Sequence, residues 1–412
     1  MLRFSLPYRP MYFLSALGAG GLAVSFFMYF MFLIPHPDTP MPTFGHWSKL
    51  LSSGSPLVQG LIVVGLVAVA ALSVLHLVLM VVNLSAHARF VRTEAYRDLR
   101  NSNAEVSLMA VPLALAMTIN VLFVSGVLGV PGLWGKVEWL FPFSVAAFGA
   151  VGVYAAVVFG RYLGRILSGG QFNADDNNHF AQLMPSFTFS MVAVGLAAPA
   201  AMSHILITSA VSLIGSLFFG AAAILWALVM MPVSVGRMLR QGVALEAAPS
   251  LLMGIPILTL LGITFVRLGS GLSHNFLHTQ LAPPLVLVVL GLFVSAQLLM
   301  GLVGWAVMRR QRYFADYVFG PKQSIATFGL VCPGVAFFVL SMFFINWGLV
   351  RTGVVTQLSA PHIALLVLVG LVQFATVALM LRLNGKLLRG AAATTPSPLS
   401  EDAAKDRAEA LV

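Results

Sequence analysis

Cysteine and charge are the scarcest features of this 412-residue sequence, which contains one cysteine and only 9% charged residues. A single cysteine excludes an internal disulfide framework, and no cluster of cysteine and histidine has the spacing of a structural zinc site. We therefore expect neither a metal nor a cofactor. Hydrophobic residues make up 59% of the chain, and its mean hydropathy is +0.94. This composition predicts an integral membrane protein that lies in a lipid bilayer.

Acidic residues are few as well, and all thirteen lie in predicted loops, at helix ends or near the C-terminus. The predicted hydrocarbon core therefore holds no carboxylate. Coupled transporters commonly place an ionisable side chain at depth, and the only candidate here is His76. We interpret His76 as a packed, hydrogen-bonded residue. Because backbone carbonyls can also bind sodium, a coupled carrier stays open as an alternative.

Motifs of catalysis are missing too. The sequence has no nucleotide-binding loop, catalytic triad signature or HExxH, so we expect no enzyme. His274 and His278 form the pattern HNFLH, but they lie in a predicted loop without a third ligand nearby, so we expect no metal there. A haem-linked or metal-linked membrane protein remains a second alternative. It needs paired histidines at matching depth, and His76 and His204 are the candidates near predicted spans.

Ten long apolar runs are present. A hydrocarbon core of about 30 Å needs roughly 20 mostly apolar residues in a helix. The runs cover approximately residues 11–34, 57–84, 107–130, 139–163, 183–202, 206–231, 250–268, 284–308, 325–350 and 361–385. The first follows Arg3 and Arg9, as in a signal peptide, but it is too long and no clear cleavage site follows. We predict ten transmembrane helices, with the first one retained.

Basic residues alternate between the two sides of these spans. One side carries 17: Arg3, Arg9, Arg89, Arg92, Arg97, Arg100, Arg161, Arg165, Arg237, Arg240, Arg309, Arg310, Arg312, Lys322, Arg382, Lys386 and Arg389. The opposite side has four: Lys49, Lys136, Arg267 and Arg351. The positive-inside rule predicts cytoplasmic N- and C-termini in a bacterial inner (plasma) membrane. The net charge of +10 then needs no nucleic-acid partner. Residues 1–390 form the membrane domain, and residues 391–412 a predicted disordered tail.

Prolines divide the spans into two sets. Pro112, Pro256 and Pro333 lie five to eight residues inside the third, seventh and ninth predicted spans, or roughly 8 to 12 Å in. Pro199 lies towards the end of the fifth, whereas even spans have proline only near an end, as at Pro232. An interior proline frees a carbonyl that hydrocarbon does not satisfy. We therefore predict kinked odd helices around a shared interior and straight even helices facing lipid. Alternatively, proline and glycine are simply common in membrane helices and serve close packing.

An uncharged interior beside a basic face suits an anion. Each bent helix offers a partial positive charge at the start of its second half, without any lysine or arginine in the pore. Polar side chains of the odd helices are candidate ligands, although bonding to their own helix backbone is the expected role of each. They are Thr118, Asn120, Ser186, Ser190, Thr259 and Thr264.

Five stretches carry a family resemblance. The longest is RYLGRILSGGQFNADDNNHFAQLMPSFTF (161–189), and the others are LPYRPMYFLSALGAGGLA, SLMAVPLALAM, APSLLMGIPILTLLG and VCPGVAFF. Over residues 5–388 the chain resembles the tellurite-resistance/C4-dicarboxylate transporter family, which includes bacterial TehA-like anion channels, fungal malate and sulfite transporters and plant slow-type anion channels. The resemblance implies five helix hairpins around a central pore, closed by a phenylalanine of the ninth helix, in a homotrimer. The implied substrates are small inorganic or organic anions.

The ninth span departs from the family pattern. Relatives commonly have the gating phenylalanine just before a proline or glycine, and this position is Cys332, followed by Pro333. Phe328 lies one turn earlier on the same face, and Phe343 lies three turns later on roughly that face. We hypothesise that Phe328 takes over the occlusion, or that Cys332 leaves the pore partly open. The alternative is that these aromatic side chains pack the core.

Overall fold

The computed structural model describes residues 4–170, 172–275 and 277–388. Within these residues the regular structure is helical without strands, and ten helices are long and apolar enough to cross a membrane. This confirms the prediction of a multi-pass, all-helical membrane protein with ten spans. The predicted tail, 391–412, lies outside the described residues.

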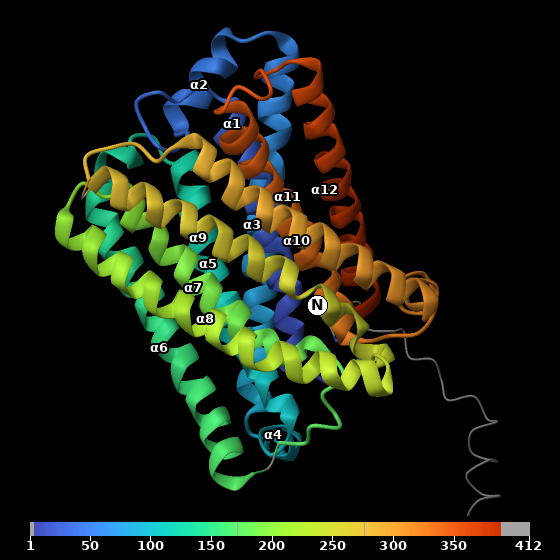
Figure 1. Cartoon of the computed structure of the whole chain (residues 1–412). Helices are drawn as coiled ribbons and strands as arrows, with labels where there is room; N and C mark the ends of the chain where they lie inside the picture. The colour runs from blue at the N-terminus through green and yellow to red at the C-terminus, as the bar shows by residue number, and fades with distance from the viewer. Residues whose placement is uncertain (1–3, 171, 276, 389–412) are drawn as a thin grey trace, which may run out of the picture.

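The α-helices run in chain order as shown in Figure 1. They are α1 (Phe13–Leu33), α2 (Phe44–Ser53), α3 (Pro56–Phe90), α4 (Glu94–Arg100), α5 (Ala110–Gly129), α6 (Val137–Gly169), α7 (Met184–Met202), α8 (Leu206–Gln241), α9 (Gly254–Asn275), α10 (Pro283–Arg310), α11 (Val331–Phe343) and α12 (Ala360–Leu387). We call the spans built on α1, α5, α7, α9 and α11 the odd spans, and those built on α3, α6, α8, α10 and α12 the even spans.

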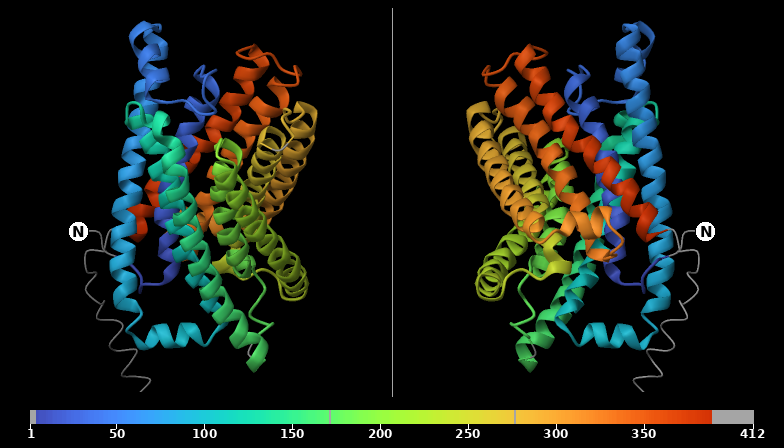
Figure 2. Two further views of the ribbon diagram at one scale, coloured as in Figure 1. Left: turned by 90° about the vertical axis from the view of Figure 1, so that its left-hand side faces the viewer. Right: turned by 90° about the vertical axis from the view of Figure 1, so that its right-hand side faces the viewer.

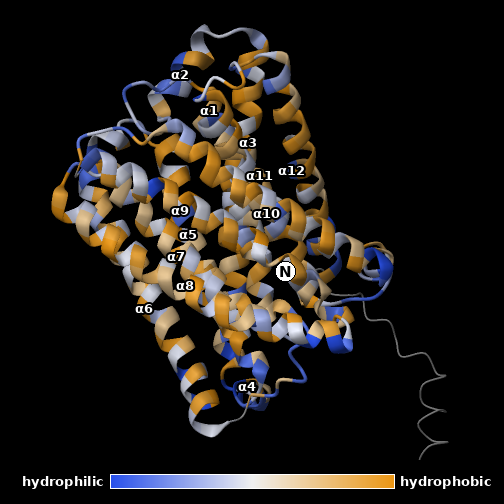
Figure 3. Cartoon of the chain, in the orientation of Figure 1, coloured by the Kyte–Doolittle hydropathy of each residue, from blue (hydrophilic) through white to orange (hydrophobic). Residues whose placement is uncertain are grey.

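The two ends of the bundle differ in charge. Figure 2 shows α4 lying across one end, and the last turns of α4, α8 and α10 there carry arginines, among them Arg100, Arg240 and Arg310. We call this the basic end, and the end that holds α2 the opposite end. Figure 3 shows hydrophilic residues gathered mainly at the ends and hydrophobic residues along the sides. Such a banded surface fits a protein whose sides contact lipid.

Burial separates the two sets of spans. The most apolar 18-residue windows of the odd spans are 78, 56, 94, 72 and 78% buried, in chain order, whereas those of the even spans are 28, 17, 33, 22 and 28% buried. Exposed Leu, Val and Phe side chains follow the outer faces of α3, α8, α10 and α12. Lipid hydrocarbon is the solvent that such faces require.

All five odd spans begin with a 3₁₀ helix. These segments are η1 (Pro10–Tyr12), η2 (Asn103–Met109), η4 (Phe180–Leu183), η5 (Leu245–Leu252) and η7 (Ile325–Leu330). Among the even spans, α6 alone follows one, η3 (Leu133–Lys136); two π-helical segments, η6 (Phe314–Phe319) and η8 (Phe344–Val350), complete the described helices. Pro112, Pro256 and Pro333 each occupy the third position of the α-helix that follows its 3₁₀ segment. A proline there removes an N–H that has no partner within the α-helix, so it is tolerated without breaking the helix.

The even spans also contain interior prolines. Pro232 lies nine residues before the end of α8, and Pro142 lies inside α6. The prediction that even spans have proline only near an end is therefore wrong at Pro232. The apolar run stops near residue 231, but α8 continues as an amphipathic helix that carries Arg237 and Arg240.

His76 joins three spans in the core. Its fully buried ring contacts the carbonyl oxygen of Ala16 in α1 through Nδ1 at 2.7 Å, and the hydroxyl of Thr118 in α5 through Nε2 at 2.9 Å. A carbonyl only accepts, so Nδ1 carries the proton of that bond. A Cβ on Gly20 of α1 would lie 2.7 Å from Nδ1, so glycine permits this close approach. His76 is a hydrogen-bonded packing residue, as expected.

Candidate functional site

Three cavities follow one another through the described part of the bundle. The central cavity, of about 120 Å³, is lined only by residues of α1, α5, α7, α9 and α11. A basic-end cavity of about 60 Å³ is lined by the first turns of four odd spans, including η4, η5 and η7. An opposite-end cavity of about 70 Å³ is lined by later residues of α1, α5 and α7, with parts of α6. Because a single water needs about 10 to 15 Å³, each cavity has room for water or a small ion.

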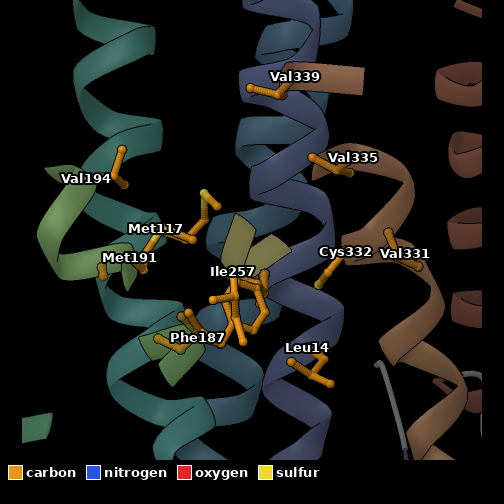
Figure 4. Close-up of a cluster of buried hydrophobic side chains, with 14 of the residues drawn as sticks. Leu14, Met117, Phe187, Met191, Val194, Ile257, Val331, Cys332, Val335 and Val339 are labelled. Carbon is orange, nitrogen blue, oxygen red and sulfur yellow. The ribbon is translucent and has the colours of Figure 1, made fainter. Parts of the chain in front are cut away.

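Two constrictions separate these cavities. Phe187, Pro256 and Cys332 line both the basic-end and the central cavity, so they form the inner constriction. Both side chains are buried, with Phe187 4% and Cys332 8% exposed. In Figure 4, Cys332 points from α11 towards the middle of a cluster that contains Phe187, Met191 and Ile257. The inner constriction is therefore apolar.

The second constriction carries a charge. Val24, Met28, Asn120 and Arg267 line both the central and the opposite-end cavity. Nη1 of Arg267 donates a hydrogen bond to the carbonyl oxygen of Val194 in α7, at 3.2 Å. Among the described residues no carboxylate pairs with Arg267, because the four ion pairs involve other side chains.

The position of Arg267 corrects a prediction from the sequence. We counted it among the four basic residues of the opposite side, at the very end of a seventh span predicted to stop near residue 268, but α9 continues to Asn275. Arg267 therefore lies roughly 20 Å from the start of α9 and 12 Å from its end at 1.5 Å per residue. The expectation of an interior without lysine or arginine is wrong at this residue. The segment LGSGLSHN, rich in glycine and polar residues, resembles a loop but is helical up to Asn275.

The gate candidates of the ninth span occupy different places. Cys332 lies at the inner constriction, Pro333 lines the basic-end cavity, and Phe343 lines the central cavity. Phe328 is fully buried in η7, with its ring centroid 6.2 Å from that of Tyr12, and it lines none of the three cavities.

The candidate kink prolines also separate. Pro256 lies at the inner constriction and Pro199 lines the opposite-end cavity. Pro112 is buried and lines none of the three cavities. The structure thus brings Cys332 and Pro256 together at one level of the axis.

Polar candidates of the odd spans mostly bond to their own helices, as expected. The side chains of Asn120, Ser190, Thr259 and Thr264 each donate to a backbone carbonyl three or four residues earlier. The hydroxyl of Thr118 lies 3.0 Å from the carbonyl oxygen of Ala114 and also contacts His76. Ser186 is buried, and its hydroxyl has no partner among the described residues. Asn120 and Thr259 also line the central cavity, so these two present polar atoms to it.

Phe187 is the aromatic residue that sequence reasoning missed. The family resemblance implies a gate in the ninth span and gives no reason to expect one in the fifth. A usable signal was present in the fifth span, where Pro185 at the start of α7 precedes Phe187 by two residues.

Metal and haem candidates lack the expected geometry. Among the described residues, no group of three His, Cys, Asp or Glu side chains could hold a metal ion. Because α9 ends at Asn275, His274 and His278 do not lie one turn apart on a helix. His204 is exposed and its ring contacts that of His274, with centroids 5.6 Å apart. Both ring nitrogens of His76 are already hydrogen-bonded.

Comparison with known proteins adds no assignment. No family model matches the chain, and no curated protein matches it. The resemblance to the tellurite-resistance/C4-dicarboxylate transporter family therefore stays a prediction from the sequence.

Proposed function

We propose that this protein is a passive anion channel or transporter, with a path along the axis of the odd spans. The observation that carries the proposal is the row of three cavities, whose central member is lined by all five odd spans and by no even span. Five helix hairpins, with odd helices inside and even helices towards lipid, account for this lining and for the difference in burial between the two sets.

Charge favours an anion as the transported species. Arg267 is the only charged residue among the described residues that line the three cavities. A guanidinium stays protonated in proteins and repels cations at close range. Coupled carriers commonly place a carboxylate or a free histidine on the path, and no such side chain lines these cavities. A proton-coupled carrier of C4-dicarboxylate, sulfite or tellurite-type anions is thus the second choice.

Phe187 and Cys332 together are our proposed site of occlusion. The inner constriction is lined by apolar side chains of both cavities, and we expect removal of the phenyl ring to join the basic-end cavity to the central one. Phe328, by contrast, packs on Tyr12 away from the cavities. The family resemblance supports a phenylalanine gate in general; in this chain the proposed aromatic comes from α7 and faces the ninth span.

Membrane placement and assembly are part of the same proposal. The positive-inside rule puts the basic end, and with it both termini, in the cytoplasm of a bacterial inner membrane. A homotrimer with one pore per subunit is implied by the family resemblance alone.

The test compares ion currents of purified protein in planar bilayers under chloride, nitrate and malate gradients. We expect a small anion-selective current for the wild type, a large increase for Phe187→Ala, and little change for the matched control Phe328→Ala. An increase in Phe328→Ala alone would move the gate to the ninth span. Absence of anion current in all three proteins, together with proton-dependent uptake in liposomes, would replace the channel by a coupled carrier; a Soret band would indicate haem instead.

A further inference from the structure

Arg267 combines depth, cavity exposure and an unmatched charge. It lies inside α9, well away from both ends of the helix, and lines two adjoining cavities. Ionisable residues at membrane depth are costly and usually pair with a neighbour or face a water-filled cavity. Arg267 faces cavities whose other polar lining residues are Asn120, shared by both, Thr259 in the central cavity and Ser144 in the opposite-end cavity. Its one hydrogen bond goes to a backbone carbonyl, and no carboxylate among the described residues balances its charge.

Most donors of the guanidinium are available. Arginine has five N–H groups, and the structure shows one hydrogen bond from Arg267, to the carbonyl of Val194. This bond holds the side chain against α7. The other N–H groups of the guanidinium remain available to a ligand in the cavities. Asn120 supplies a second polar side chain at the same constriction, held by a bond from its amide nitrogen to the carbonyl of Ala116 at 3.3 Å.

The shape of the group defines its ligand. A planar guanidinium offers two parallel N–H donors, which match two coplanar oxygens of one anion. A spherical halide has no pair of acceptor atoms to match the two parallel N–H donors. The surrounding volume, of about 120 Å³ on one side and about 70 Å³ on the other, limits the ligand to a small anion.

We propose that Arg267, with Asn120 beside it, is an anion-coordinating site in the path, and that its guanidinium favours small planar oxyanions such as formate or nitrate over chloride. The inference rests on the proposed function for its place in a transport path, but binding at the site is independent of conduction. Arg267 then determines specificity, while the apolar inner constriction controls passage.

Three variants test the proposal. Arg267→Gln removes the charge, and Arg267→Lys keeps the charge but loses the planar fork. Lys136→Gln is the matched control, since it removes one positive charge from an exposed residue that lines none of the three cavities. Size-exclusion profiles and far-UV circular dichroism in detergent establish that each variant is folded.

Binding is read without transport, from the shift of the thermal unfolding midpoint with added sodium formate, nitrate or chloride. Formate and nitrate should stabilise the wild type and Lys136→Gln at lower concentration than chloride does. Because charge-assisted hydrogen bonds are at stake, Arg267→Gln should bind formate roughly 10- to 100-fold more weakly. Arg267→Lys should retain binding but lose the preference for formate over chloride. Equal midpoint shifts in wild type and Arg267→Gln would overturn the proposal.

Bi-ionic reversal potentials provide the second readout. Arg267→Gln should lose anion selectivity, and Arg267→Lys should keep it while the permeability ratio of formate to chloride falls towards one. Formate binding that depends on Arg267 in a protein without any current would support the site and reject the channel. Anion currents that Arg267→Gln leaves unchanged would support the channel and reject the site.

Discussion

His76 offers the sharpest test of how the core is held together. The change is His76→Leu, which replaces the fully buried ring by an apolar side chain and removes the bonds to Ala16 and Thr118. Side-chain hydrogen bonds between membrane helices contribute about 0.6 kcal/mol on average and up to about 1.7. Two such bonds predict a loss of roughly 1 to 3 kcal/mol in the free energy of unfolding.

The assay is reversible unfolding in mixed micelles, followed by far-UV circular dichroism as the fraction of denaturing detergent rises. His204→Leu is the matched control, because that histidine is exposed and its ring contacts His274 without a side-chain hydrogen bond among the described residues, so it should change stability by less than about 0.5 kcal/mol. A double-mutant cycle with Thr118→Val isolates the Nε2 bond and should give a coupling of about 0.6 to 1.7 kcal/mol.

The anion current of His76→Leu distinguishes a structural role of His76 from a direct role in transport. If the residue only braces helices, folded His76→Leu protein should conduct with wild-type ion preference and without a change in pH dependence. Unchanged unfolding together with complete loss of transport would refute the bracing argument and make His76 a proton relay or a ligand.

Three further outcomes are expected. Cys332→Phe should fill the inner constriction and suppress most anion current, whereas Cys332→Ser should conduct like the wild type; equal currents in both would exclude this level as the narrow point. Glu105, 2% exposed, pairs with Arg100 and Arg165, so Glu105→Ala should cost about 3 kcal/mol of unfolding free energy, and a loss below about 1 would show that water already screens the pairs. Burial lowers the pKa of His179 below its usual 6.5, so the unfolded chain binds more protons and stability should fall as pH drops below about 6.5. His179→Gln should lack this component, and identical pH profiles of unfolding midpoints would contradict the assignment.

Hydropathy was sufficient to predict the ten spans, because each must supply roughly 20 apolar residues to cross the hydrocarbon. It was insufficient where a helix continues beyond the apolar run. Pro232 and Arg267 were both placed near span ends, since polar or glycine-rich residues follow them, yet α8 and α9 extend for several more residues. In these extensions the helix is maintained by its backbone hydrogen bonds, and the hydropathy of the sequence does not indicate such bonds.

The candidate site was only partly accessible from the sequence. Cys332 and Pro256 were singled out by chain position, and they line the inner constriction. Phe187 and Arg267 come from other spans, and only the packing of α7 and α9 around the axis brings them to the cavities. Contacts between distant segments depend on how helices pack, which the periodicity of a single apolar helix does not specify.

The 3₁₀ segments that open all five odd spans change how far a given number of residues reaches. A 3₁₀ helix rises about 2.0 Å per residue, against 1.5 Å in an α-helix. The six residues of η7 therefore extend roughly 3 Å further than they would as α-helix. Conversion of such a 3₁₀ segment into α-helix would shorten it, so the rest of the span would shift along its axis and rotate about it. The length of each odd span is thus set by winding as well as by residue number.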